Sequence, residues 1–361
     1  MSRLTEYLKD PILLAMWQKI RAAGAIKSIS LDLTHECNLR CDGCYYYGEG
    51  MDDIQPPKGH SALDKFILDE KKRGTNFVTI VGGEPSLELS RLKKIYDNFK
   101  TNVATNGIIR IPYEGFESLP IGVAIWGNHQ TDSELRNKGK RDLFEIAKIN
   151  YKNDPRAFWY YTVSPDHAHE IGPVVEECLE NGNRVLFNYF SDINAVNNAQ
   201  DHSYVFQGVE KEINKMIHRY PGKIWMTPYF NRVISRGELF EEKWGYEVCT
   251  NLSSNLASNQ ERFDNGNPYN PHFRAYNADF KTTRRCCTGI QRECGSCYDT
   301  WEHFSWIMIN LRKHLGSQSD FRNWLQIVFL FYLINRLIDP DEGIALFHRA
   351  RSESIPSNVV G

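Results

Sequence analysis

The sequence lacks a long hydrophobic run and an excess of charge of either sign. Its most apolar segment, residues 327–334, is flanked by polar and charged residues and is far shorter than the roughly 20 residues of a transmembrane helix. The 43 basic and 45 acidic side chains leave a formal net charge of −2, so no basic field attracts nucleic acid or an anionic membrane. We expect a buried helix at 327–334, no membrane contact and no nucleic-acid partner.

The first residues also lack a secretory pattern. The apolar stretch at 12–17 is short and no cleavage-site pattern follows it, so we expect an amphipathic leader helix within residues 1–27 and a cytoplasmic protein. Nine cysteines are present. Without a secretion signal they favour metal ligation over a disulfide framework.

Between residue 28 and about residue 192, short apolar runs alternate with amphipathic stretches. The apolar runs predict six strands, at residues 28–34, 77–81, 102–105, 122–126, 158–163 and 184–190. The amphipathic stretches predict helices between them, at residues 62–73, 87–99, 140–151 and 168–181. This order predicts βα units on a parallel sheet with right-handed crossovers. The expected fold class is α/β, a partial (β/α)6 TIM-type barrel with a C-terminal cysteine-rich, mainly helical extension.

The expected organisation has four parts. The leader at 1–27 precedes a core at 28–195. Residues 196–300 complete the barrel and carry a second group of cysteines, and residues 301–361 form a helical tail. In βα architectures the chemistry lies at the carboxyl ends of the strands, which is where the notable loops of this sequence fall.

The first cysteine group is Cys37-x3-Cys41-x2-Cys44, directly after the first predicted strand. A structural zinc ion normally takes four protein ligands, and His35 or a distant residue would have to supply the fourth. A 4Fe–4S cluster also normally takes four cysteines. Three ligands leave one iron open, and an open position is where a substrate or cosubstrate can coordinate.

The spacing of these cysteines resembles the signature of radical S-adenosylmethionine enzymes. The resemblance covers about residues 28–192. It includes the lead-in at 31–34, Tyr45, Gly82-Gly83-Glu84-Pro85 and Thr105-Asn106-Gly107, in the expected order. Gly43 is a departure, because the family usually has an aromatic residue before the third cysteine, and Tyr45 is the alternative contact for the adenine.

The resemblance implies a set of roles. Cys37, Cys41 and Cys44 would hold three irons, and the fourth iron would chelate S-adenosylmethionine, with the loop Gly82, Gly83 and Glu84 against its methionyl amine. Glycines let a backbone approach a ligand closely, and carbonyl or carboxylate oxygens accept hydrogen bonds from an ammonium group. The remaining expected cofactor contacts are Tyr45, Thr105, Asn106, Asn128 and Ser164. His129 and Asp166 are further candidates, and each of the residues after strands four and five has an alternative reading as a loop or capping residue.

The second cysteine group is Cys286-Cys287-x6-Cys294-x2-Cys297. It resembles a shortened form of the cysteine-rich C-terminal domain of family members that modify peptides or sugars. Adjacent cysteines seldom bind one metal together, so we expect one of Cys286 and Cys287, with Cys294 and Cys297, to hold an auxiliary 4Fe–4S cluster. A zinc knuckle and a redox disulfide are the alternatives.

Cys249 and Cys178 stand alone in the sequence. Cys178 lies in an amphipathic stretch and is expected in the core. Cys249 has three interpretations: a thiol that returns a hydrogen atom to a substrate radical, a further cluster ligand, or a small core residue. The first resembles radical S-adenosylmethionine epimerases of aminoglycosides, such as the one in neomycin biosynthesis, and of ribosomal peptides.

The leading hypothesis is an enzyme that alters one carbon–hydrogen centre in a small polar molecule or a peptide, most simply by epimerisation. Dehydrogenation, dehydration and carbon–carbon bond formation are alternatives within the class. Flavodoxin or ferredoxin is the expected electron donor. A zinc-stabilised nucleic-acid-binding module is the alternative outside enzymes, and the neutral charge counts against it.

Overall fold

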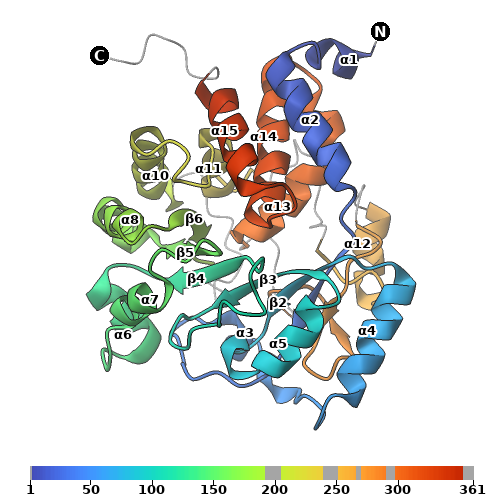
Figure 1. Ribbon diagram of the computed structural model, residues 1–361, viewed down its shortest axis with the longest axis vertical. Helices are drawn as coiled ribbons and strands as arrows, with labels where there is room; N and C mark the ends of the chain where they lie inside the picture. The colour runs from blue at the N-terminus through green and yellow to red at the C-terminus, as the bar shows by residue number, and fades with distance from the viewer. Residues whose placement is uncertain (1, 192–204, 239–250, 266–269, 290–296, 353–361) are drawn as a thin grey trace.

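A computed structural model describes residues 2–191, 205–238, 251–265, 270–289 and 297–352 (Figure 1). Its centre is an eight-stranded sheet in the order β6-β5-β4-β3-β2-β1-β7-β8. The strands are β1 (Ser28–Asp32), β2 (Phe77–Val81), β3 (Lys100–Thr105), β4 (Ile121–Ile125), β5 (Ala157–Val163), β6 (Arg184–Tyr189), β7 (Ala275–Tyr276) and β8 (Thr283–Arg284).

Strands β1 to β6 are all parallel to their neighbours, and β7 is parallel to β1. Among the strands of the described residues, only β8 runs antiparallel to its neighbour, β7. The α/β class and the parallel sheet predicted from the alternation are therefore confirmed, whereas the partial-barrel description stays a prediction. Parallel register brings the carboxyl ends of β1 to β6 to the same edge of the sheet, so the loops after them meet there.

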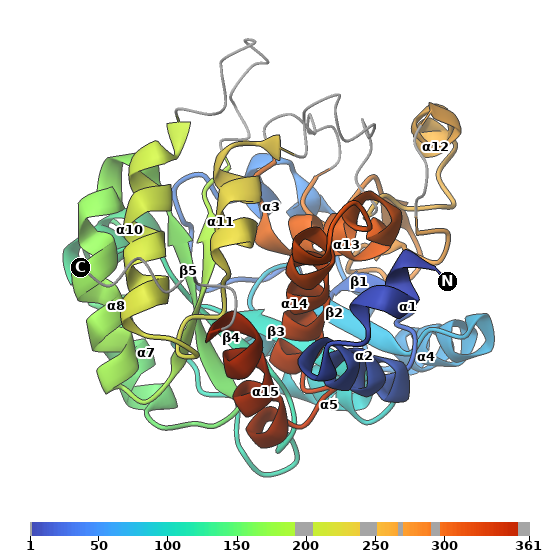
Figure 2. The same ribbon diagram turned by 90° about the horizontal axis from the view of Figure 1, so that it is seen from above.

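Helices cover the outer face of this sheet. They are α4 (Ser61–Arg73), α5 (Leu89–Tyr96), α6 (His129–Asn137), α7 (Leu143–Tyr151) and α8 (Ile171–Glu180). Figure 2 shows α7, α8 and α10 (Gln207–Arg219) side by side beyond β5, with α11 (Pro228–Ser235) next to them. These helices bury the outer face of the sheet, which is lined by apolar side chains such as Ile29, Trp159 and Phe187.

The C-terminal helices pack together on the other side of the sheet. They are α13 (Thr300–Ile309), α14 (Gln318–Ile334) and α15 (Pro340–Ser352), and α2 (Pro11–Ala23) lies against α14 (Figures 1 and 2). The expected buried helix at 327–334 is the second half of α14, and all of its side chains are buried. None of the helices in the described ranges is both long and apolar enough to span a bilayer.

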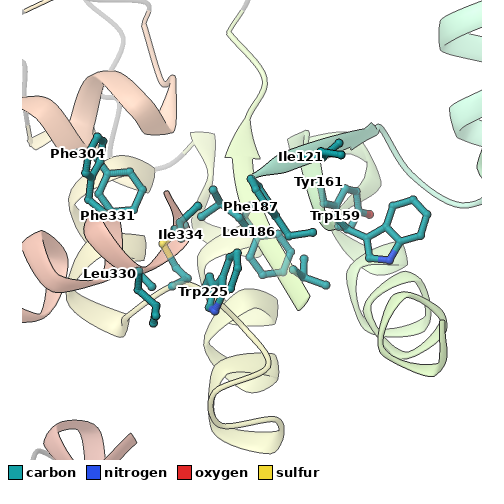
Figure 3. Close-up of a cluster of buried hydrophobic side chains, with 14 of the residues drawn as sticks. Ile121, Trp159, Tyr161, Leu186, Phe187, Trp225, Phe304, Leu330, Phe331 and Ile334 are labelled. Carbon is teal, nitrogen blue, oxygen red and sulfur yellow. The ribbon is translucent and has the colours of Figure 1, made fainter. Parts of the chain in front are cut away.

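The two layers meet around β6. Successive side chains of a strand point to opposite faces, so Phe187 packs on Tyr161 in the outer core while Leu186 faces the C-terminal helices (Figure 3). Phe304 of α13 and Phe331 of α14 pack edge to face in the same inner layer, with ring centroids 5.7 Å apart. The N-terminus of α13 is fixed to β6, because the Thr300 hydroxyl donates to the Phe187 carbonyl at 2.9 Å.

Three local predictions differ from the structure. The leader is two helices, α1 (Arg3–Tyr7) and α2, because Asp10 caps α2 and Pro11 occupies its first turn. Helix α6 was not predicted. The segment at 251–277, which is rich in Asn and Ser and for which no helix or strand is predicted, contains a 3-10 turn η6 (Ala257–Asn259), helix α12 (Gln260–Asn265) and strand β7. Cys178 is fully buried in α8, as expected.

Candidate functional site

The cysteine triad lies in the loop between β1 and the short helix α3 (Tyr45–Gly48). Cys37, Cys41 and Cys44 are all partly exposed free thiols. Among the described residues, only His129, Glu145 and Glu177 bring three potential ligand atoms within 4.8 Å of one another, so the triad's sulfur atoms are spread more widely. Around a tetrahedral zinc ion, Zn–S bonds of about 2.3 Å place sulfur atoms only about 3.8 Å apart. The spacing fits a larger group such as an iron–sulfur cluster better than a single ion.

The electrostatics of the triad reflect burial and one nearby cation. Burial raises the pKa of the Cys37 thiol, and it raises the pKa of Cys41 to about 11 despite the opposing effect of the Arg136 guanidinium beside it. The Leu39 N–H donates to the Cys37 sulfur at 3.4 Å. Because metal ligation requires the thiolate, a positive charge and an N–H donor both favour the liganding form.

Gly82 and Gly83 follow β2 and pack against the backbone of the triad loop. The Gly83 N–H donates to the Thr34 carbonyl at 2.9 Å and the Glu84 N–H to the Glu36 carbonyl at 2.8 Å. A Cβ at position 83 would lie 2.0 Å from the Glu36 oxygen, and Gly82 has a φ of +103°. The glycine pair therefore lets the two loops join backbone to backbone.

The Glu84 carboxylate is buried and is shared among three protein donors. It accepts from the Ser86 N–H at 2.9 Å, the Thr105 hydroxyl at 2.7 Å and the Asn106 N–H at 2.7 Å. The resemblance implied a contact between this loop and a cosubstrate amine. The Glu84 side chain ties the loop after β2 to the loop after β3, and its contact with the cosubstrate amine stays a prediction.

Asn106 continues this connection to the triad. Its side-chain amide donates to the Asn38 side-chain oxygen at 2.6 Å, and its nitrogen lies 3.9 Å from the Cys37 sulfur. Glu84, Thr105 and Asn106 thus form one hydrogen-bonded chain that ends at the first cysteine.

Gly43 faces an aromatic side chain that the sequence did not reveal. It has a φ of +73°, and a Cβ there would come within 2.8 Å of the Phe190 ring. Phe190, just after β6, packs at 6.1 Å against Trp126, just after β4. These two rings occupy the space beside the third cysteine, where the family usually has an aromatic residue in the loop itself. Their separation in the sequence left no local signal.

A central cavity of about 270 Å³ opens on the inner face of the sheet. Cys44 and Tyr45 line it from the triad loop, and Trp301 and Phe331 line it from α13 and α14. Its walls also carry inward residues from β1 to β6: Ser30, Thr79, Asn102, Ala124, Tyr160 and Asn188. The triad loop thus forms part of the wall of a cavity that is lined by both aromatic and polar side chains.

Parts of the chain are similar in sequence to a known family and to two curated proteins. Residues 29–119 match the family described as "4Fe-4S single cluster domain". The sporulation killing factor maturation protein SkfB of Bacillus subtilis is 26% identical over 185 residues, 46% of this chain and 44% of SkfB. A probable GTP 3',8-cyclase of Methanococcus aeolicus is 33% identical over 98 residues, 24% of this chain and 32% of the cyclase. The chain therefore spans less than half the length of these curated relatives.

Among solved structures, native anSMEcpe with bound AdoMet and Cp18Cys peptide is similar with a TM-score of 0.47 and 15% identity, covering 81% of this chain and 83% of that one. The family match covers the cysteine triad and the loops after β2 and β3. The findings support the radical S-adenosylmethionine superfamily. The cofactors that they support are a 4Fe–4S cluster and S-adenosylmethionine.

Two other expected contacts of a radical S-adenosylmethionine site have structural partners. The Asn128 side-chain oxygen caps α6, accepting from the N–H groups of Gln130 and Thr131 at 3.0 Å. His129 pairs outward with Asp142 and Glu177. Ser164 precedes the 3-10 turn η3 (Pro165–Glu170) without capping it, and Asp166 is exposed. These positions do not line the central cavity.

The second cysteine group is described in part. Cys294 and Cys249 lie outside the described residues. Cys286 packs on Leu252 in a small apolar cluster, whereas Cys287 lines the central cavity. Cys297 is partly exposed. The adjacent cysteines therefore have different surroundings, which sequence alone could not assign.

Proposed function

We propose that this protein is a radical S-adenosylmethionine enzyme that abstracts a hydrogen atom from a substrate held in the central cavity. The observation that carries the proposal is that Cys44 of the triad loop and Tyr45 of α3 line the same cavity as inward residues of β1 to β6. A reactive group generated beside the triad would meet a substrate there and not bulk water, and exclusion of water is what radical chemistry requires.

The roles of the residues follow from their contacts. Cys37, Cys41 and Cys44 would hold a 4Fe–4S cluster, which supplies the electron that splits the sulfonium of S-adenosylmethionine into methionine and a 5′-deoxyadenosyl radical. Gly82 and Gly83 fix the loop after β2 against the triad loop. Their carbonyl oxygens are the proposed acceptors for the methionyl amine.

Aromatic side chains in the cavity wall could pack against the adenosyl part of the cosubstrate. Phe190 lies beside Gly43, and Trp126 packs against Phe190. Both line the cavity, and we assign them the adenine contact together with Tyr45. Thr105, Asn106, Asn128 and Ser164 remain proposed cosubstrate contacts. For Thr105 and Asn106, the hydrogen bonds to Glu84 favour a positioning role.

A peptide is the proposed substrate class. The similarity to a maturation protein of a killing factor favours it, and a small polar molecule is the alternative. Within the class we propose epimerisation of one carbon centre, with dehydrogenation, dehydration and carbon–carbon bond formation as the other outcomes. Flavodoxin or ferredoxin is the proposed electron donor, and Cys286, Cys294 and Cys297 are the proposed ligands of an auxiliary cluster.

The experiment is anaerobic reconstitution with iron and sulfide, followed by incubation with S-adenosylmethionine and dithionite. We expect a brown protein that contains iron and acid-labile sulfide and that forms 5′-deoxyadenosine, measured by liquid chromatography and mass spectrometry. The triple variant Cys37→Ala/Cys41→Ala/Cys44→Ala should form none. Cys178→Ala, a buried thiol outside the site, is the matched control and should retain formation. Protein that binds zinc in place of iron, or intact S-adenosylmethionine beside the reductant, would refute the proposal.

A further inference from the structure

The segment that carries Cys286 and Cys287 is fixed to the strand that precedes the triad loop. Arg284 donates to the carbonyl of Cys286 at 3.1 Å and to that of Cys287 at 3.0 Å. The same guanidinium forms a buried two-point ion pair with Asp32, at the end of β1, at 2.5 and 2.9 Å. A fully buried arginine with all these partners holds its neighbours in one geometry. The position of Cys287 relative to the triad loop is therefore set by the fold.

The two adjacent thiols have separate environments. The Cys286 sulfur lies 3.5 Å from the Gly289 carbonyl and packs on Leu252 in the small apolar cluster. The Cys287 side chain lines the central cavity together with Cys44 and Tyr45, and its thiol donates to the carboxylate of Glu302 on α13. Only one of the pair faces the chamber in which a substrate would react.

The chamber also carries polar groups that lack partners among the described residues. The buried Tyr160 hydroxyl is one, and Tyr160 lines the cavity directly. The Ser30 hydroxyl and the Asn102 side-chain oxygen are two more on the same walls. Because a buried polar group without a hydrogen bond costs free energy, these groups are available to bind polar atoms of a substrate in the cavity. Cys287, Tyr45 and Glu302 all exert electrostatic effects on Tyr160, so the thiol lies in the same neighbourhood.

We infer that Cys287 is the thiol that donates a hydrogen atom in the central cavity, and that Glu302 is the residue that positions it. The inference rests on the proposed function. It also assigns Cys286, and not Cys287, to the auxiliary cluster. Cys287 thereby takes the donor role for which Cys249 was the candidate from sequence.

The proposed reaction transfers two hydrogen atoms in sequence. The 5′-deoxyadenosyl radical removes one hydrogen atom from a substrate carbon and becomes 5′-deoxyadenosine. The substrate radical takes a hydrogen atom from the Cys287 S–H bond, which forms the new C–H bond and leaves a thiyl radical. One electron from a flavodoxin- or ferredoxin-type carrier and one proton from solvent restore the thiol. Delivery from the opposite face of the carbon inverts its configuration.

The test needs no knowledge of the substrate. With S-adenosylmethionine and dithionite alone in deuterated water, the adenosyl radical should meet the exchanged S–D bond of Cys287 directly. Wild-type protein should then release 5′-deoxyadenosine that carries deuterium at the 5′ carbon, measured by mass spectrometry. Dithionite supplies the electron that regenerates the thiol, and solvent supplies the deuteron.

The matched variants separate the candidate thiols. Cys287→Ser should still form 5′-deoxyadenosine but lose its deuterium, because a hydroxyl is a much poorer hydrogen-atom donor than a thiol. Cys249→Ser should keep the deuterium, and so should Cys178→Ser, the control at a buried thiol in α8. Deuterium that persists in Cys287→Ser and disappears in Cys249→Ser would overturn the assignment, and so would unlabelled product from the wild type. Absence of 5′-deoxyadenosine from the wild type would instead refute the proposed function itself.

A second measurement is independent of turnover. Iron and sulfide contents after reconstitution should be unchanged by Cys287→Ser, whereas Cys297→Ser should lower both. If Cys287→Ser lost as much iron as Cys297→Ser, Cys287 would be a cluster ligand and the inference would be wrong.

Discussion

Arg284 and Asp32 form an ion pair in which both side chains are almost completely buried. Arg284 lies on β8 and Asp32 at the end of β1, 252 positions apart in the sequence. The pair therefore joins the strand that leads into the cysteine triad to the segment that carries the second cysteine group. Because neither charge reaches water, each depends on the other for its solvation.

Removing one partner should therefore be costly. Arg284→Met leaves the Asp32 carboxylate buried without its cation, and we expect a loss of about 3–5 kcal/mol in the free energy of unfolding. The double variant Asp32→Leu/Arg284→Met should recover most of that loss, since it buries no charge. Urea unfolding of the apoprotein measures both. Lys65→Met, which breaks an exposed pair with Asp69, is the control and should cost less than about 1 kcal/mol. Equal effects of Arg284→Met and Lys65→Met would contradict the prediction.

Gly83→Ala tests the junction of the two site loops. The new methyl group would lie 2.0 Å from the Glu36 carbonyl oxygen, so the backbone of one loop must move. We expect the variant to fold with lower thermal stability and to take up less iron on reconstitution, because the displaced loop carries the triad. Gly172→Ala is the matched control, since its nearest neighbour would be the Met216 methyl group at 3.9 Å. Full iron content in Gly83→Ala would show that the contact is unimportant.

Much of the parallel sheet could be predicted from the sequence. The strand at 77–81 was placed at the residues that β2 occupies, and the others within two residues at either end. Each of these strands carries a short group of apolar or aromatic residues, and polar turn residues separate it from the next element. The hydrophobic pattern therefore carries enough information to find them.

Helix α6 shows where that pattern fails. Its buried side chains are polar: Thr131, Asp132, Ser133 and Arg136. Without an apolar stripe there is no periodic signal, and only the capping residue Asn128 marked its start. Contacts within the site could not be predicted either, because they join residues that are distant in the sequence. Glu84 bonds to Thr105 and Asn106, and Phe190 approaches Gly43. Nor does sequence say which of two adjacent cysteines faces a cavity.

The Arg136 guanidinium is a buried positive charge beside Cys41 of the triad. It pairs with Asp132 at 3.0 Å. A positive charge beside a cluster ligand favours the reduced, more negative cluster. We expect Arg136→Gln to lower the midpoint potential by tens of millivolts, since about 1.4 kcal/mol corresponds to about 59 mV for one electron.

The measurement is a redox titration of the reconstituted protein followed by electron paramagnetic resonance. Asp132→Asn removes the opposite charge from the same pair and should raise the potential. Shifts in the same direction for the two variants would mean that they act through a change of structure and not through charge.

His303 gives the protein a calculable sensitivity to acid. It is fully buried in α13, and its Nδ1 lies 2.8 Å from the Asp299 carbonyl. Burial lowers its pKa to about 4, against 6.5 for an ordinary histidine. Between these values the unfolded chain binds a proton that the folded chain does not, so stability rises with pH in this window. The contribution of His303 to the free energy of unfolding is complete above about pH 6.5. It is lost as the pH falls towards 4, and this loss is on the order of 3 kcal/mol.

His303→Gln removes the titrating group and should flatten this part of the profile. We expect the difference in unfolding free energy between pH 7 and pH 5 to shrink relative to the wild type, as measured by urea unfolding at each pH. The control is His218→Gln, because His218 is exposed on α10 and its removal should leave the profile unchanged. A wild-type slope that survives in His303→Gln would assign the acid sensitivity to other groups. A slope lost in both variants would show that the substitutions act through something other than the buried imidazole.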